Sequence, residues 1–269
     1  MGLLWFMRGA EAAQAAPGEV EFARAHAAAA AGEIPAQRAL GDVYRERAQY
    51  REAMEWYLCA ARQGDALSLY RLGEMYEEGQ GELPSMAQAL RCYTEAAQRG
   101  HAGAQYAAAR CWARGQGCER DDAMAVAWFE EAAQRGHAGA QHHLGVAYRR
   151  GLGVVQDLEV ALRWFRRAAE QGHARAQREL ALLNAEPGAW RSDVEAYMWA
   201  RLAARSDPTA EGLRLSAASR LDERQILEAE RLADAWLAAR GRAAPGDVAQ
   251  GAGARLQSMS ASQRMAAMF

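Results

Sequence analysis

Residues 138–172 read AGAQHHLGVAYRRGLGVVQDLEVALRWFRRAAEQG, and this stretch decides the fold. Its first half places small and large residues, Gly145 and Leu144 among them, on one helical stripe. A Gly-Leu-Gly turn follows, and Asp157 is placed to cap a second helix. Gly172 ends that helix at a position where positive φ is common. The stretch therefore predicts a helix–turn–helix unit, in which neither helix can bury its apolar face without a neighbouring unit.

The same unit recurs along the chain. Gly64, Gly100, Gly136 and Gly172 lie 36 residues apart, and the alanine pairs before them keep the same step. So do the residue pairs that end in tyrosine or phenylalanine, which are Trp56-Tyr57, Cys92-Tyr93, Trp128-Phe129 and Trp164-Phe165. Repeats of this period stack into a solenoid in which each unit contacts its neighbours. The predicted fold class is therefore all-α, an α/α solenoid (superhelix) of about five helix–turn–helix repeats with terminal capping helices.

The ends of the array depart from the repeat pattern, as terminal units must because they present a polar outer side. The first unit carries Arg47-Ala48-Gln49 where later units carry Gly-x-Gly. Asp222 and Gln225 form a capping box at the start of the last predicted helix. The predicted organisation is a flexible N-terminus at 1–18, a capping helix at 19–32, repeats at 33–205, C-terminal capping helices at 206–240 and a disordered tail at 241–269.

Composition excludes several classes of function. The chain has 269 residues, 32 basic and 34 acidic, so its formal net charge of -2 lacks the basic excess typical of nucleic-acid binders. Every Lys/Arg position is arginine, which rules out Schiff-base, phosphate-loop and kinase-type lysine chemistry. No apolar run is long enough for a transmembrane segment. The N-terminal apolar stretch is too short for a secretory signal, so we expect a cytoplasmic protein; an earlier start codon would permit a periplasmic one.

The repeat pattern resembles a known family. Ala-x-x-Leu-Gly-x-x-Tyr, then Gly-x-Gly, then Asp, then Ala-x-x-Trp-Phe/Tyr-x-x-Ala-Ala-x-x-Gly is similar to the Sel-one-like repeat family, a relative of the tetratricopeptide repeats. Residues 138–172 match it most fully, and the resemblance covers about residues 33–205. It implies a right-handed α-solenoid that serves as an adaptor or scaffold in signalling, envelope biogenesis, secretion or host interaction.

One branch of that family is cysteine-rich, carries a disulfide in every unit and is linked to penicillin binding. The four cysteines of this chain do not recur at a fixed repeat position; they are Cys59, Cys92, Cys111 and Cys118. They form no Cys-x-x-Cys pair either, and scattered cysteines in apolar surroundings are usually small buried hydrophobes. Neither the disulfides nor the β-lactam activity is therefore carried over to this chain.

Histidines and glycine turns raise the question of metal or nucleotide sites. His101, His137 and His173 each follow a repeat-ending glycine, one repeat apart. Packed helices lie about 10 Å apart, too far for one metal ion whose ligands sit about 2 Å away. We expect these histidines to form turns, and the Gly-x-Gly segments to be interhelical turns because none continues as a nucleotide-binding motif. No catalytic residue, metal or cofactor is predicted.

The candidate binding surface is the face of the first helix of each repeat, which lines the inner groove in related helical repeats. Four positions, counted from the Leu-Gly pair, are expected to face inward. They give the predicted partner-binding residues Tyr70, Glu74, Glu77, Glu78, Tyr106, Arg110, Arg114, His142, Arg149, Arg150 and Arg178. The groove would be acidic near the second repeat and basic in the third to fifth repeats. An arginine fork suits carboxylates, so the predicted partner is another protein or an extended peptide segment with acidic residues.

Ordinary solvated surface is the competing interpretation of these arginines, because exposed ion pairs are common and weak. The favoured function is a non-enzymatic scaffold that binds a partner protein in a bacterial signalling, envelope or secretion context. An alternative is an immunity or neutralising protein that occludes a toxin or effector enzyme. A more remote alternative is a β-lactam-binding hydrolase, which would need a nucleophile and a base that the motifs do not supply.

Overall fold

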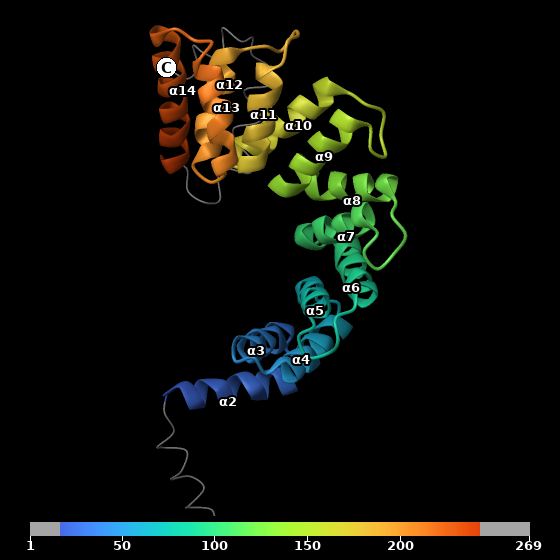
Figure 1. Cartoon of the computed structure of the whole chain (residues 1–269). Coiled ribbons are helices and arrows are strands. Elements are labelled where there is room, and N and C mark those ends of the chain that lie inside the picture. The colour runs from blue at the N-terminus through green and yellow to red at the C-terminus, as the bar shows by residue number, and fades with distance from the viewer. Residues whose placement is uncertain (1–16, 243–269) are drawn as a thin grey trace, which may run out of the picture. The chain divides into compact units, whose positions relative to one another are not determined.

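The computed structural model describes residues 17–242, and every regular element in that range is a helix (Figure 1). The predicted all-α repeat solenoid is therefore confirmed. In chain order the repeat helices are α3 (Ile34–Glu46) and α4 (Tyr50–Arg62), α5 (Ala66–Glu78) and α6 (Met86–Gln98), α7 (Ala102–Arg114) and α8 (Asp122–Gln134), α9 (Ala138–Arg150) and α10 (Leu158–Glu170), α11 (Ala174–Ala185) and α12 (Asp193–Ala204). The first member of each pair is called the A helix and the second the B helix.

Further helices flank the repeats. They are α2 (Pro17–Ala30) before the first pair, and η1 (Pro208–Ala210), α13 (Glu211–Ala218) and α14 (Glu223–Arg242) after the last. The predicted capping box is confirmed, because the side chains of Asp222 and Gln225 accept hydrogen bonds from each other's backbone N–H groups at 2.8 and 3.0 Å. The predictions of a flexible N-terminus and a disordered tail concern residues that lie, except for 17–18 and 241–242, outside the described range.

The chain forms two compact units that divide between Asp121 and Asp122. Unit 1 contains α2 to α7. Within it, α3 packs on α2 and α4, α5 packs on α4 and α6, and α7 packs on α6. Tyr57 and Tyr93 are the largest side chains in its core, and both are fully buried. Each tyrosine ring lies over the glycine of a Leu-Gly pair, Gly41 and Gly73 respectively, which explains the small residue at that position.

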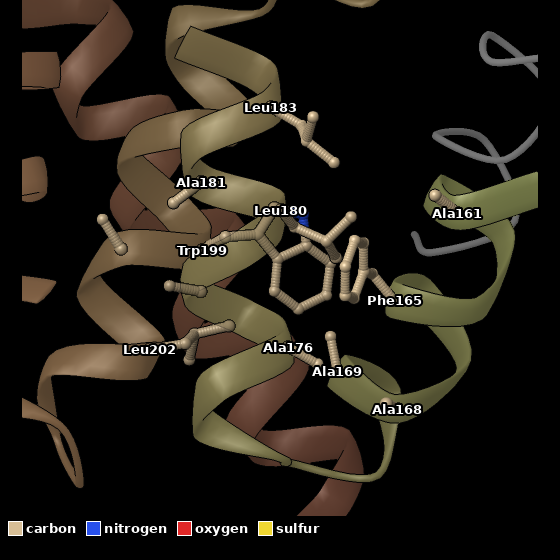
Figure 2. Close-up of a cluster of buried hydrophobic side chains, with 12 residues drawn as sticks. Ala161, Phe165, Ala168, Ala169, Ala176, Leu180, Ala181, Leu183, Trp199 and Leu202 are labelled. Atoms are coloured by element: carbon tan, nitrogen blue, oxygen red, sulfur yellow. The ribbon is translucent and has the colours of Figure 1, made fainter. Parts of the chain in front are cut away.

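Unit 2 contains α8 to α14. Figure 2 shows one of its apolar clusters, in which the ring of Phe165 from α10 lies beside Leu180 of α11. The paired alanines Ala168 and Ala169 are fully buried, and their small side chains let neighbouring helices approach closely. At the end of the unit, the Arg240 guanidinium donates a hydrogen bond of 3.2 Å to the carbonyl oxygen of Glu170. Helix α14 therefore supplies a partner for the open end of α10.

The turns between A and B helices follow the predicted chemistry. Gly151 and Gly153 have φ of 70° and 69°, and Asp157 accepts the N–H bonds that cap α10. A side chain at Gly153 would meet the carbonyl oxygen of Asp122 at 2.4 Å, so this loop packs on the start of α8. In the first repeat, which lacks Gly-x-Gly, Ala48 takes φ of 57° instead.

Candidate functional site

The repeat-ending glycines are each followed by a residue that caps the next A helix. The Nδ1 atoms of His101, His137 and His173 accept hydrogen bonds of 3.1, 3.2 and 3.2 Å from the N–H groups three residues later. Asp65 caps α5 in the same way. Burial lowers the pKa of each of these histidines, which keeps the ring neutral and able to accept. The predicted turn-forming role is thus confirmed.

Among residues 17–242, no group of three or more His, Cys, Asp or Glu side chains is arranged so that it could hold a metal ion.

In unit 1, arginines surround the acidic residues of the predicted binding surface. Glu74 on α5 accepts hydrogen bonds from Arg71 at 2.8 Å and from Arg45 of α3 at 3.1 Å. Burial alone would raise the pKa of Glu74, but the hydrogen bonds from Arg71 and Tyr70 hold it below its usual value. Glu78 is more exposed and lies 3.5 Å from Arg45. These contacts join consecutive A helices.

A second set of contacts joins α5 to α7. The carboxylate of Glu77 accepts a hydrogen bond of 2.7 Å from the Tyr93 hydroxyl and another of 3.3 Å from Arg110. The Arg110 guanidinium also lies 5.9 Å from the ring centre of Tyr106, which is half-buried. Arg114, one turn further on, is exposed and has no ion-pair partner within the described part of the chain.

In unit 2, two of the predicted arginines form ion pairs with carboxylates of the same unit. Arg149 on α9 forms ion pairs with Glu179 of α11 and, at 3.5 Å, with Glu186. Arg178 on α11 pairs with Asp207 at 3.3 Å. Both of these arginines are therefore neutralised inside the unit.

Arg150, next to Arg149, is exposed and forms no ion pair with any residue from 17 to 242. It occupies the same position in its repeat as Arg114 does in the preceding one.

Two of the predicted residues, His142 and Tyr70, pack against other side chains instead of facing an open groove. His142 is only 8% exposed, because its ring packs 4.9 Å from the ring of His173 and 5.8 Å from that of Phe165. This burial lowers the pKa of His142 to about 3. At the matching position in unit 1, Tyr70 packs in the same way against His101, and burial raises its pKa to about 12. Little of the His142 surface is available to a partner.

Many of the predicted positions thus lie where consecutive A helices meet within a unit, whereas Arg114 and Arg150 form no ion pair among residues 17–242. Sequence reasoning identified one side of most pairs but missed partners such as Glu179, Glu186 and Asp207. The available signal was an opposite charge 29 to 37 residues away, close to one repeat period. Side-chain pairing at this spacing follows from the stacking of equivalent helices.

A buried row of glutamines also escaped the sequence reasoning. Its members donate side-chain N–H bonds to the backbone carbonyl eight residues earlier, at the end of the preceding helix: Gln37 to Ala29, Gln105 to Ala97, Gln141 to Ala133 and Gln177 to Ala169. All four are at most 5% exposed. Each of these carbonyl oxygens also accepts the N–H of the glycine three residues later, so the glutamine amide supplies its second hydrogen bond. Their in-phase recurrence was the signal that could have revealed them.

Comparison with known proteins gives a consistent result. The Sel1 repeat model matches residues 34–65, 66–101, 102–137, 138–173 and 174–208. The chain is similar to a protective antigen of uropathogenic Escherichia coli strains that displays an SLR fold, with 30% sequence identity and a TM-score of 0.70 over 82% of this chain and 49% of that one. This chain therefore spans about half the length of that relative.

It is also similar to a Sel1 repeat protein from Oxalobacter formigenes, with 29% identity and a TM-score of 0.63 over 68% of this chain and 75% of that one. No curated protein matches the chain. In the described range, none of the helices combines the length and the apolar character that a membrane crossing requires.

Proposed function

Because the chain belongs to the Sel1 repeat family, whose members generally mediate protein–protein interactions, we propose that it is a non-enzymatic scaffold that binds another protein through its A helices. The proposed ligand is an extended segment of the partner that carries acidic residues. Arginine is suited to this role because its planar guanidinium binds a carboxylate through two parallel hydrogen bonds.

One observation carries this proposal: Arg114 and Arg150 are exposed at the same position of two repeats, and neither forms an ion pair with any residue from 17 to 242. Arg114 ends α7 in unit 1, and Arg150 ends α9 in unit 2. Each follows an A-helix surface whose other charges already have partners inside the unit. A partner carboxylate can bind these two arginines without displacing a carboxylate of the chain itself.

We expect the other predicted arginines to contribute less to partner binding; they are Arg110, Arg149 and Arg178. Each is already in an ion pair, so a partner carboxylate would exchange one ion pair for another and gain little net free energy. Charge reversal at these positions would also disturb the contacts between repeats. A loss of binding in such variants could therefore arise from a damaged fold.

A discriminating experiment uses the unpaired arginines. The partner is captured on the tagged chain from the source organism, identified and purified, and its Kd is measured by calorimetry for R114E/R150E. The matched control is R91E/R163E, which reverses two exposed arginines on the B helices α6 and α10 that form no ion pair within the described part of the chain. We expect the first variant to bind at least about tenfold more weakly, a change of about 1.4 kcal/mol, and the control to bind like the wild type.

Circular dichroism of both variants establishes that the fold is retained. Unchanged affinity in R114E/R150E would overturn the proposed acidic ligand. Equal losses in the two variants would point to general charge attraction and would equally reject a specific A-helix surface.

A further inference from the structure

The same side-chain stack joins consecutive repeats in both units, but with different chemistry. In unit 1, the ring of Tyr70 on α5 packs 4.8 Å from that of His101, at an interplanar angle of 31°. In unit 2, the ring of His142 on α9 packs 4.9 Å from that of His173, at 30°. The two stacks occupy equivalent positions of their repeats. Unit 2 thus has two imidazoles where unit 1 has a phenol and one imidazole.

We propose that the His142–His173 stack is an acid-sensitive joint between the fourth and fifth repeats, which opens when its imidazoles bind protons, whereas the Tyr70–His101 joint responds much less. This inference concerns the repeats themselves and does not depend on the proposed partner.

Each imidazole makes a contact in the closed joint that protonation of the ring would disrupt. The Nδ1 atom of His173 accepts the N–H of Ala176 at 3.2 Å and so caps α11. A protonated ring has two donors and no acceptor, so the cap would be lost. The ring of His142 is buried against Phe165, and a charge placed there would lose its hydration.

The groups that face the stack disfavour a positive charge further. Burial is the main cause that lowers the pKa of His142, and the neighbouring His173, His143, Arg175 and Arg178 add to it. Burial likewise lowers the pKa of His173, with contributions from Arg175 and His137. These groups come from α9, its capping residue and α11; α10 contributes the uncharged ring of Phe165. Arg178 is itself partly neutralised by Asp207.

The environment of His101 in unit 1 differs. Burial is again the main cause that lowers its pKa, and Arg71 contributes in the same direction. Asp65 and Glu74 act in the opposite direction and favour a proton on this ring. Its stacking partner Tyr70 gains no proton in mild acid, so at most one proton is taken up when this joint opens.

The size of the effect follows from proton linkage. An opened joint exposes imidazoles with an ordinary pKa near 6.5, while burial in the closed joint lowers the pKa of His142 to about 3 and also lowers that of His173. Lowering the pH from 7.5 to 5.5 should then favour opening about tenfold through His142 and by up to about a further tenfold through His173. At the Tyr70–His101 joint the corresponding change is at most about tenfold.

Hydrogen exchange of the full chain, followed by mass spectrometry, tests the proposal. Exchange is compared at pH 7.5 and 5.5 after correction for the intrinsic exchange rate, in peptides from α11 and in peptides from α5. In the wild type we expect protection in α11 to fall by more than about tenfold and up to about a hundredfold, and in α5 by tenfold or less.

The informative variant is H142Y/H173N, which places the residue of unit 1 at the first position and keeps a capping side chain at the second. We expect the change in α11 to fall below about threefold in this variant. H142Q and H173N as single variants provide the same comparison if the tyrosine does not fit: H142Q should remove about one tenfold step, and H173N up to about one. An unchanged α11 in the wild type, or an equal acid response in H142Y/H173N, would overturn the proposal.

Discussion

A Cβ atom placed on Gly145 would lie 2.5 Å from the ring of Phe165, closer than side chains approach in real proteins. The A helix α9 can therefore lie against this ring only because residue 145 has no side chain. Gly73 and Tyr93 show the same relationship in unit 1, with a separation of 2.4 Å. The recurring Leu-Gly pair thus has a steric origin: leucine fills the core, and glycine makes room for the aromatic ring of the B helix.

Gly145→Ala should consequently destabilise the protein by about 1–3 kcal/mol, because the added methyl group forces the Phe165 ring or α9 to move. Urea unfolding followed by tryptophan fluorescence measures the free energy of unfolding. Gly212→Ala is the matched control: Gly212 lies in α13, and an added Cβ there has no neighbour within 4 Å. It should raise stability by about 0.5–1 kcal/mol, as glycine to alanine does in an open helical site. Equal effects would contradict the steric explanation.

Ala48→Gly should stabilise unit 1. Ala48 has φ of 57°, where a Cβ atom costs roughly 1–2 kcal/mol, while glycine loses more freedom on folding. We expect a net gain of about 0.5–1 kcal/mol, measured by urea unfolding. The reverse change, Gly64→Ala, provides the comparison, because Gly64 has φ of 93° with open space around its Cβ position. It should lower stability by a similar amount, and a gain in that variant would refute the backbone argument.

The features that the sequence predicted well are those that repeat. Helix pairs, glycine turns and the Asp157 cap follow from local patterns that recur in phase, so each copy supports the others. The side-chain contacts of the candidate site were harder to predict from the sequence. Arg149 is paired because Glu179 lies on the next A helix. His142 is buried because its ring packs against that of His173 and does not face solvent. Such contacts depend on the exact rotation of neighbouring helices, which one sequence does not determine.

Gln141→Leu should destabilise unit 2 by roughly 1–2 kcal/mol, because it removes two hydrogen bonds of the buried Gln141 side chain. Its amide nitrogen donates at 3.2 Å to the carbonyl oxygen of Ala133, which keeps a bond of 3.0 Å from the N–H of Gly136, and its amide oxygen accepts at 2.7 Å from the half-buried side chain of Gln171. Leucine should fit sterically, since Leu69 occupies the matching position in unit 1. Thermal unfolding monitored by circular dichroism gives the measurement. A variant as stable as the wild type would mean that solvent reaches both groups.

His137→Asn should make stability less dependent on pH. Burial lowers the pKa of His137 in the folded chain below its unfolded value of 6.5, so the unfolded chain binds more protons in acid. The stabilising contribution is therefore complete above about pH 6.5 and is lost as the pH falls through the folded pKa, by up to about 1.4 kcal/mol per pH unit. Asparagine also caps helices well, so stability at pH 8 should change by less than about 0.5 kcal/mol.

Urea unfolding at pH 8, 6 and 5 measures this difference. His137→Ala serves as the control, because it removes the cap as well and should lose about 1 kcal/mol at pH 8. An asparagine variant with the full acid slope of the wild type would show that His137 does not contribute to it.

Glu179→Gln should reveal how much the ion pairs between A helices contribute to stability. Glu179 is only 13% exposed and binds Arg149, so its loss leaves a half-buried guanidinium with the exposed Glu186 as its remaining partner. After discounting for solvent screening of Arg149, we expect a loss of about 1–2 kcal/mol in urea unfolding. Glu131→Gln breaks the exposed pair with Arg135 within one helix, with side chains 48% and 43% exposed, and should cost less than about 0.5 kcal/mol. Because screening weakens exposed pairs most, 0.5 M salt should abolish the small effect and preserve most of the large one. Two equally small losses would indicate that the A-helix arginines are bound too weakly to be withheld from a partner, and would place Arg149 beside Arg150 as a binding residue.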